Sequence, residues 1–177
     1  MIVQVIQNAL RFLLLIGLQV VLLNHIQWSG FVNPYVYLLF ILLLPVETPK
    51  GLLLVLGFVT GLVIDMFGNS GGLHAAATVA VAFARPGILR LLAPRDGYEA
   101  EMRLGPQTMG LKWFATYLVL MTFIHHFVLF YLEVFRFSEF FLTFFKVLLN
   151  VVISVLLMIM GQYLFGRSVN RNERILG

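Results

Sequence analysis

Residues 52–77 read LLLVLGFVTGLVIDMFGNSGGLHAAA, an apolar run that ends in a carboxylate and continues into a glycine-rich turn. The run is long enough to lie in a lipid bilayer, where an ionisable side chain needs a physical reason. Gly57, Gly61 and Asp65 are spaced four residues apart, so a helix places them on nearly one face. Two glycines on one face let a neighbouring backbone approach closely. The stretch therefore predicts a helix-packing face that ends in a polar turn.

The composition of the whole chain predicts an all-α integral membrane protein. Of its 177 residues, 60% are hydrophobic and only 11% are charged, and the mean hydropathy is +0.95. Each membrane-crossing helix consumes about 20 residues, so residues 1–177 accommodate a single transmembrane domain of about six helices. Because the chain has no cysteine, disulfides, thiol nucleophiles and cysteine metal sites are excluded.

Apolar runs separated by turn residues predict where these helices lie. We expect them near residues 3–24, 32–45, 51–67, 72–92, 112–134 and 139–166. The first run lacks the basic start and the small-residue cleavage site of a secretory signal, so we expect a retained helix. Pro34 and Pro45 bound the second run and leave about 12 residues for it, which predicts a short or partly re-entrant helix.

The distribution of basic residues predicts the orientation, because cytoplasmic connections of membrane proteins carry the excess of Lys and Arg. With the N-terminus inside, the inner side holds Lys50, Arg90, Arg95, Arg103, Lys112, Arg167, Arg171 and Arg174, and the outer side holds only Arg136 and Lys146. We expect both termini in the cytoplasm, with a cytoplasmic tail at residues 167–177. Residues 93–111 form a cytoplasmic loop, either a docking site or a solvated connector. Topology and lipid headgroups explain the net charge of +4, so we expect no nucleic-acid partner.

The predicted outer hairpin contains Asp65, Gly72 and His74. We expect Asp65 at the outer end of the third helix, where water and the backbone N–H groups of residues 67–75 solvate it. There it organises the hairpin rather than relaying protons. His74 is positioned to contact Asp65 across this hairpin. The glycines lack the following lysine of a phosphate-binding loop, so we expect no nucleotide site.

Six potential metal ligands share the predicted outer side, namely His25, Asp65, His74, His125, His126 and Glu133. Their spacing does not favour a metalloenzyme, because no two histidines have the i, i+4 spacing of H-E-x-x-H. Adjacent side chains on a helix point about 100° apart, so His125 and His126 predict one inward and one interfacial role. We expect no metal, no cofactor and no catalytic residues.

Two arginines lie within predicted helices near the inner surface. We expect Arg11 to extend toward lipid headgroups. Arg85 precedes Pro86, which removes a backbone donor and kinks a helix, so we expect the cation to bind carbonyl groups that the kink frees. A pair between Arg85 and Asp65 is excluded, because the two residues lie at opposite ends of their helices.

The order of these motifs resembles the MreD family of rod shape-determining membrane proteins. The resemblance rests on an amide and arginine in the first helix, then NHI, NPYVYLLFILLLP, GLVIDMF, a glycine-rich turn to GLHAAA, and ARP. The most specific positions are Gly61, Leu62, Asp65, Gly72, Leu73 and His74. It covers most of the chain and implies a fold similar to the substrate-binding subunits of energy-coupling-factor vitamin transporters.

The resemblance implies a non-enzymatic membrane scaffold in the bacterial cytoplasmic membrane. Such a scaffold binds an MreC-like membrane protein and through it links the MreB filament to RodA and a penicillin-binding transpeptidase. A homodimer is a further expectation. The alternative is a vitamin-like small-molecule-binding subunit with an outward pocket near Asp65, His74 and His25. A membrane enzyme that uses the outer histidines is the third hypothesis.

Overall fold

The computed structural model describes residues 2–25, 32–99, 102, 104–135 and 139–165. Every element in this part of the chain is helical. The elements are α1 (Ile2–Val21), the 3-10 helix η1 (Leu23–His25), α2 (Leu39–Leu42), α3 (Lys50–Gly68), α4 (Leu73–Leu91), α5 (Pro106–Met109), α6 (Leu111–Val134) and α7 (Phe140–Phe165). The all-α prediction is confirmed for these residues.

Three of the described helices are long and apolar enough to cross a membrane, namely α3, α6 and residues 140–164 of α7. Residues 6–21 of α1 form a shorter apolar helix. The prediction of a short helix in the second run is confirmed, but the bounds 32–45 are too long, because only the four residues of α2 are helical there. The proline boundaries explain this result, since the run between them is too short for a regular crossing.

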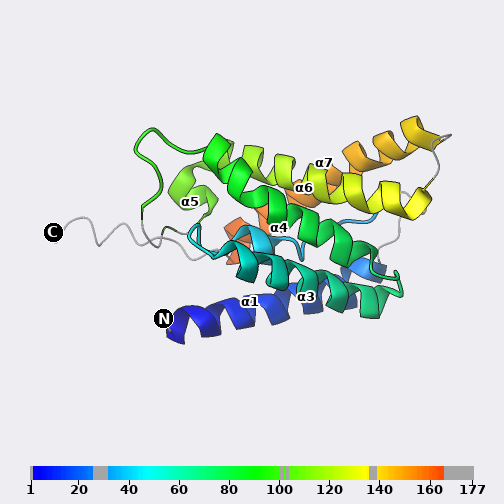
Figure 1. The fold of residues 1–177 in the computed structure, drawn as a ribbon, viewed down its shortest axis with the longest axis horizontal. Helices are drawn as coiled ribbons and strands as arrows, with labels where there is room; N and C mark the ends of the chain where they lie inside the picture. The colour runs from blue at the N-terminus through cyan, green and yellow to red at the C-terminus, as the bar shows by residue number, and fades with distance from the viewer. Residues whose placement is uncertain (1, 26–31, 100–101, 103, 136–138, 166–177) are drawn as a thin grey trace.

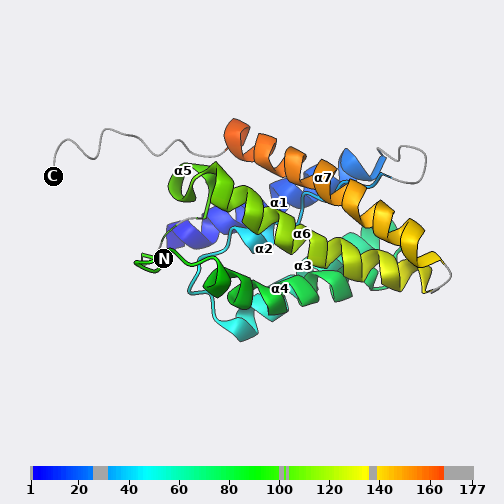
Figure 2. The same ribbon diagram turned by 90° about the horizontal axis from the view of Figure 1, so that it is seen from above.

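The long helices pack side by side around residues 32–45. α3 packs on α4, α4 on α6 and α6 on α7, while α1 contacts α2 and α3. Figure 2 shows α6 between α4 and α7. Figure 1 shows that the start of α1 and the start of α3 lie at one end of the bundle. We call it the basic end, because Lys50 begins α3, Arg90 lies in the last turn of α4 and Lys112 lies in the first turn of α6. The turn from α3 to α4 and the end of α6 lie at the other, here called the hairpin end.

Residues 33–45, here called the central segment, return the chain from the hairpin end to the basic end. Gln19, near the end of α1, bonds to Pro34 and Val36, whereas Arg11, nearer its start, bonds to Leu43. The segment therefore runs antiparallel to α1. Every residue from 36 to 44 is buried. In the part of the chain that the structure describes, this irregular segment lies among the long helices α1, α3, α4, α6 and α7 (Figure 1).

The outer surface of the bundle is apolar. Large hydrophobic side chains stand exposed on three different helices, with Met66 76%, Phe83 78% and Phe141 86% exposed. Extended exposed apolar surface of this kind is typical of a membrane or protein interface. Together with the lengths of α3, α6 and α7, it identifies the chain as a membrane protein.

α3 and α4 approach each other closely at the two glycines of the opening stretch. A Cβ added at Gly61 would overlap the Ala75 Cα and the His74 carbonyl oxygen, and would lie 2.6 Å from the Ala75 nitrogen. At Gly57 the added Cβ would lie 2.9 Å from the Ala82 Cβ. Real Cβ atoms do not approach other heavy atoms this closely, so glycine is required at Gly61 for this helix spacing.

Residues 93–99, the described start of the loop after α4, fold back against the basic end. The Tyr98 hydroxyl donates to the Leu89 carbonyl at 2.7 Å, and the Trp113 indole N–H donates to the Leu92 carbonyl at 2.7 Å. These bonds satisfy carbonyls at the end of α4 that have no partner within the helix. Burial raises the pKa of Tyr98 above its ordinary value, and the Arg85 charge opposes this rise.

Candidate functional site

The first half of the central segment is held by side chains of α1 and α7. An irregular backbone in a membrane interior must have its N–H and C=O groups bonded by the protein. Gln19 does this twice, since its Nε2 donates to the Pro34 carbonyl at 3.0 Å and its Oε1 accepts the Val36 N–H at 2.9 Å. Ser154 Oγ of α7 accepts the Tyr35 N–H at 3.1 Å.

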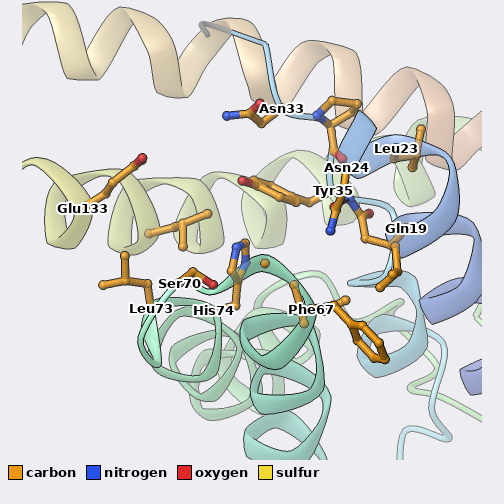
Figure 3. Close-up of a pocket in the computed structure, with 15 residues that line it drawn as sticks. Gln19, Leu23, Asn24, Asn33, Tyr35, Phe67, Ser70, Leu73, His74 and Glu133 are labelled. Carbon is orange, nitrogen blue, oxygen red and sulfur yellow. Dashed lines mark hydrogen bonds between the residues drawn. The ribbon is translucent and has the colours of Figure 1, made fainter. Parts of the chain in front are cut away.

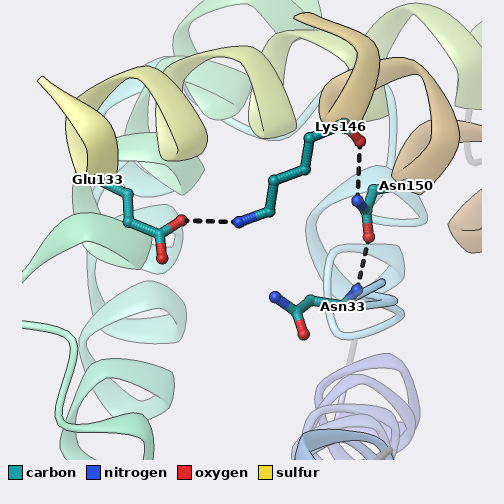
Figure 4. A network of polar contacts seen from close by, with 4 residues as sticks. All are labelled: Asn33, Glu133, Lys146 and Asn150. Atoms are coloured by element: carbon teal, nitrogen blue, oxygen red, sulfur yellow. Dashed lines mark hydrogen bonds and ion pairs between the residues drawn. The ribbon is translucent and has the colours of Figure 1, made fainter. Parts of the chain in front are cut away.

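A second side chain of α7, Asn150, binds the first residue of the central segment, Asn33. Asn150 Oδ1 accepts the Asn33 N–H at 2.6 Å, and Asn150 Nδ2 donates to the Lys146 carbonyl one turn earlier at 2.8 Å (Figure 4). The Lys146 ammonium forms an ion pair with Glu133 of α6 at 3.5 Å. Polar residues inside α7 therefore connect the central segment to the end of α6.

Arg85 of α4 binds the second half of the central segment. Its guanidinium donates to the carbonyls of Leu42 at 3.5 Å, Pro45 at 3.5 Å and Leu44, and its Nε donates to the Tyr117 hydroxyl at 3.1 Å. Tyr117 in turn donates to the Leu42 carbonyl at 3.2 Å. The side chain is 1% exposed. A planar guanidinium with five donors can bond the three carbonyls at the end of the central segment at the same time.

The Arg85 prediction needs correction. Arg85 does bind carbonyls, but these belong to the end of the central segment rather than to the turn that Pro86 disrupts. The Arg11 guanidinium donates to the Asn8 side chain at 3.3 Å and to the Leu43 carbonyl at 3.4 Å, and its extension toward headgroups stays a prediction. Both side chains therefore bind polar groups within the bundle.

Asp65 closes the hairpin between α3 and α4. Its Oδ1 accepts the His74 N–H at 3.0 Å and the Ser70 hydroxyl at 2.6 Å, and its Oδ2 accepts the Ala75 N–H at 2.8 Å. The N–H groups of His74 and Ala75 belong to the first turn of α4, where a negative charge is favourable. Gly72 precedes that turn with φ of +94°, a conformation that favours glycine.

His74 contacts Asp65 through its backbone N–H, and its ring lies elsewhere. The His74 Nδ1 is 3.0 Å from the Tyr37 hydroxyl, which is also 2.6 Å from His125 Nε2. Neighbouring His126 bonds to the Thr122 carbonyl at 2.9 Å and lies 3.3 Å from Ser154 Oγ. The prediction of one interfacial histidine is wrong, because His125 and His126 are both 0% exposed.

The predicted outer ligands that the structure describes do not gather in one metal site, although the His74 and His125 rings have centroids 6.2 Å apart and the His125 and His126 rings 5.3 Å apart. Among the described residues, no group of three His, Cys, Asp or Glu side chains lies close enough to hold a metal ion. The His25 side chain lies outside the described residues. Asp65 and His74 lie at the hairpin, His125 and His126 lie in the core, and Glu133 pairs with Lys146.

A cavity of about 430 Å³ lies at the hairpin end (Figure 3). Its lining comes from α1, the start of the central segment, the α3–α4 hairpin and α6. The polar members of the lining are Gln19, Asn24, Asn33, Tyr35, Ser70, His74 and Glu133. Convergent polar groups in a concave site of this volume are typical of a small-molecule site.

The sequence patterns did not single out Gln19, Tyr37, Asn150 or Ser154. Each is a buried polar side chain in an otherwise apolar run, and each bonds to another segment of the bundle. Polar residues within membrane helices are functional or structural by default, so this pattern was the available signal. Their partner, the irregular backbone of the central segment, is visible only in the folded chain.

Compared with models of protein families, with curated proteins and with solved structures, the chain matches none of them. The expected similarity to energy-coupling-factor subunits therefore stays a prediction.

Proposed function

We propose that this protein is a non-enzymatic membrane scaffold of the bacterial cell-elongation machinery, as the resemblance to MreD implies. The observation that supports this proposal is that the buried polar side chains bond to the protein's own backbone. Gln19, Arg85 and Asn150 are bonded to the backbone of the central segment. These bonds, together with the close α3–α4 contact, make a rigid body whose outer helix faces are apolar.

A rigid bundle with little mass outside the membrane binds partners through its helix faces. The partner that the resemblance implies is an MreC-like membrane protein, with the MreB filament, RodA and a transpeptidase linked indirectly. In the proposed topology, six passes put both termini on one side of the membrane, and the excess of Lys and Arg in the predicted inner connections favours the cytoplasmic side of the inner membrane. A second copy of the chain is a further candidate partner.

Crosslinking in native membranes, followed by identification of the attached chains, tests this proposal. We expect an MreC-like protein among the products. Depletion of the protein in its host supplies the functional test, with altered rod width and altered insertion of new cell wall as the expected result. Unchanged width and insertion after complete depletion would refute the scaffold.

The cavity at the hairpin end favours a second candidate, a small-molecule-binding subunit of a membrane transporter. Its location agrees with the outward pocket such a subunit needs, although Asp65 is bonded within the hairpin instead of facing a ligand. A stoichiometric small molecule retained through purification, combined with normal rod shape after depletion, would favour this candidate over the scaffold.

A further inference from the structure

Several polar groups of the cavity have no partner among the described residues. The Tyr35 hydroxyl and the Asn33 side-chain amide form no hydrogen bond there, although both backbone N–H groups are bonded to α7. Asn24 Oδ1 accepts from Gln19 at 3.0 Å, and its Nδ2 has no partner within the described ranges. Figure 3 shows these side chains around one space. These groups can therefore bind a polar ligand, whereas polar side chains such as Gln19 are already bonded to other parts of the protein.

The hydrogen-bond chain behind the cavity determines what His74 offers to a ligand. His125 Nδ1 is buried and has no hydrogen-bond partner in the part of the chain that the structure describes. An unpaired buried N–H is rarer than an unused acceptor, so the His125 proton belongs on Nε2, which donates to the Tyr37 oxygen at 2.6 Å. Tyr37 then donates its own proton to His74 Nδ1 at 3.0 Å. In the neutral ring this places the His74 proton on Nε2 as a donor, and His74 lines the cavity.

The charge of the cavity comes from Glu133. It is the one charged side chain among the described lining residues, and it is 48% exposed. One carboxylate oxygen contacts the Lys146 ammonium at 3.5 Å, with the Lys146 side chain 16% exposed, and the other oxygen has no partner among the described residues. The carboxylate of Asp65 is bonded to the hairpin and adds no free acceptor. A cationic group of a ligand is therefore favoured at Glu133.

We propose that this cavity binds a small molecule that carries an ammonium group together with neutral carbonyl or hydroxyl oxygens. The ammonium group pairs with Glu133, and an oxygen accepts the His74 Nε2–H. Tyr35, Asn33 and Asn24 bind the remaining polar groups. The inference goes beyond the scaffold and is independent of it, because partner binding uses the outer helix faces.

A matched pair of peptide amides tests the ligand class. Alanyl-alaninamide carries an ammonium group and two carbonyls, and its N-acetylated form loses that charge and gains an acetyl group, so Glu133→Gln separates the effect of charge from the effect of size. We expect the full-length protein in lipid nanodiscs to bind the charged probe at least about ten-fold more tightly than the acetylated probe, measured by calorimetry. Higher salt concentration weakens only the charged probe.

Variants assign the contacts. Glu133→Gln lowers the affinity for the charged probe about ten-fold and leaves the acetylated probe unchanged, whereas Tyr35→Phe weakens both probes. Glu47→Gln is the control, because Glu47 is exposed and does not line the cavity. Equal binding of both probes, no binding of either, or no effect of Glu133→Gln would overturn the inference. Thermal unfolding of each variant verifies the fold, and capture of the MreC-like partner by Glu133→Gln shows separately whether the scaffold stands.

Discussion

Replacing Gly61 with alanine adds one methyl group at the closest contact between α3 and α4. The added Cβ would lie 2.6 Å from the Ala75 nitrogen and would overlap the Ala75 Cα and the His74 carbonyl oxygen. All three are backbone atoms of α4, so no rotamer change can relieve the overlap. Ordinary contacts between such atoms are about 3.5 Å or longer, and the two helices must therefore separate locally by about 1 Å.

Two effects set the magnitude. Overpacking of this kind costs about 1–3 kcal/mol, and the immobile backbone favours the upper part of that range. Alanine in place of a helical glycine contributes about 0.5–1 kcal/mol in the opposite direction. We expect Gly61→Ala to lower the free energy of unfolding by about 2 kcal/mol.

Gly51→Ala is the matched control within the same helix, because a Cβ at Gly51 has no atom within 4 Å. It should be neutral or stabilising, and Gly57→Ala should be intermediate, since its nearest contact is a side-chain Cβ at 2.9 Å. The free energies of unfolding of the three variants are measured on the purified proteins in one detergent, with unfolding induced by heat or by denaturant. A Gly61→Ala protein as stable as Gly51→Ala would refute the close-packing argument.

Three further predictions concern the buried polar groups and the partner. Asp65→Asn leaves an N–H of α4 facing an amide donor and should cost about 1–3 kcal/mol of unfolding free energy; an unchanged value would contradict the capping role. Gly61→Leu should still reduce capture of an MreC-like partner more than Asp65→Asn does, and a pull-down with the reverse order would contradict helix packing as the basis of binding. Arg85→Lys offers three N–H donors in place of five and cannot bond all of the three carbonyls and the Tyr117 hydroxyl, so it should lower stability by about 2 kcal/mol in the same assay, whereas full stability would show that the guanidinium is dispensable.

Local patterns predicted the elements that depend on residues close in sequence. The four-residue spacing of Gly57, Gly61 and Asp65 anticipated a close helix face that ends in a polar turn, and the structure has that arrangement. The glycines after Asp65 anticipated a tight turn, and Gly71 and Gly72 both have positive φ. Such features follow from helix periodicity and backbone freedom alone.

Contacts between distant segments were outside the reach of those patterns. The run at 32–45 is apolar enough to resemble a helix, yet its fold depends on Gln19, Arg85 and Asn150, three residues from three other helices. Likewise, the burial of His126 depends on α7, because Ser154 lies 3.3 Å from its ring. Helix periodicity gives the angle between two neighbouring side chains but not the surroundings of either one.

The sequence by itself determined that this is an apolar, all-helical chain with a close-packed face at Gly57 and Gly61 and a capped turn at Asp65. Hydropathy and spacing are properties of the covalent chain and can be read without a fold. Only the tertiary structure decided that the central segment crosses the bundle without a long helix and that Tyr35, His74 and Glu133 meet at one cavity. The physical reason is that an unpaired backbone group in an apolar interior requires a bonding partner, and the partner that satisfies it comes from wherever the packed helices place one.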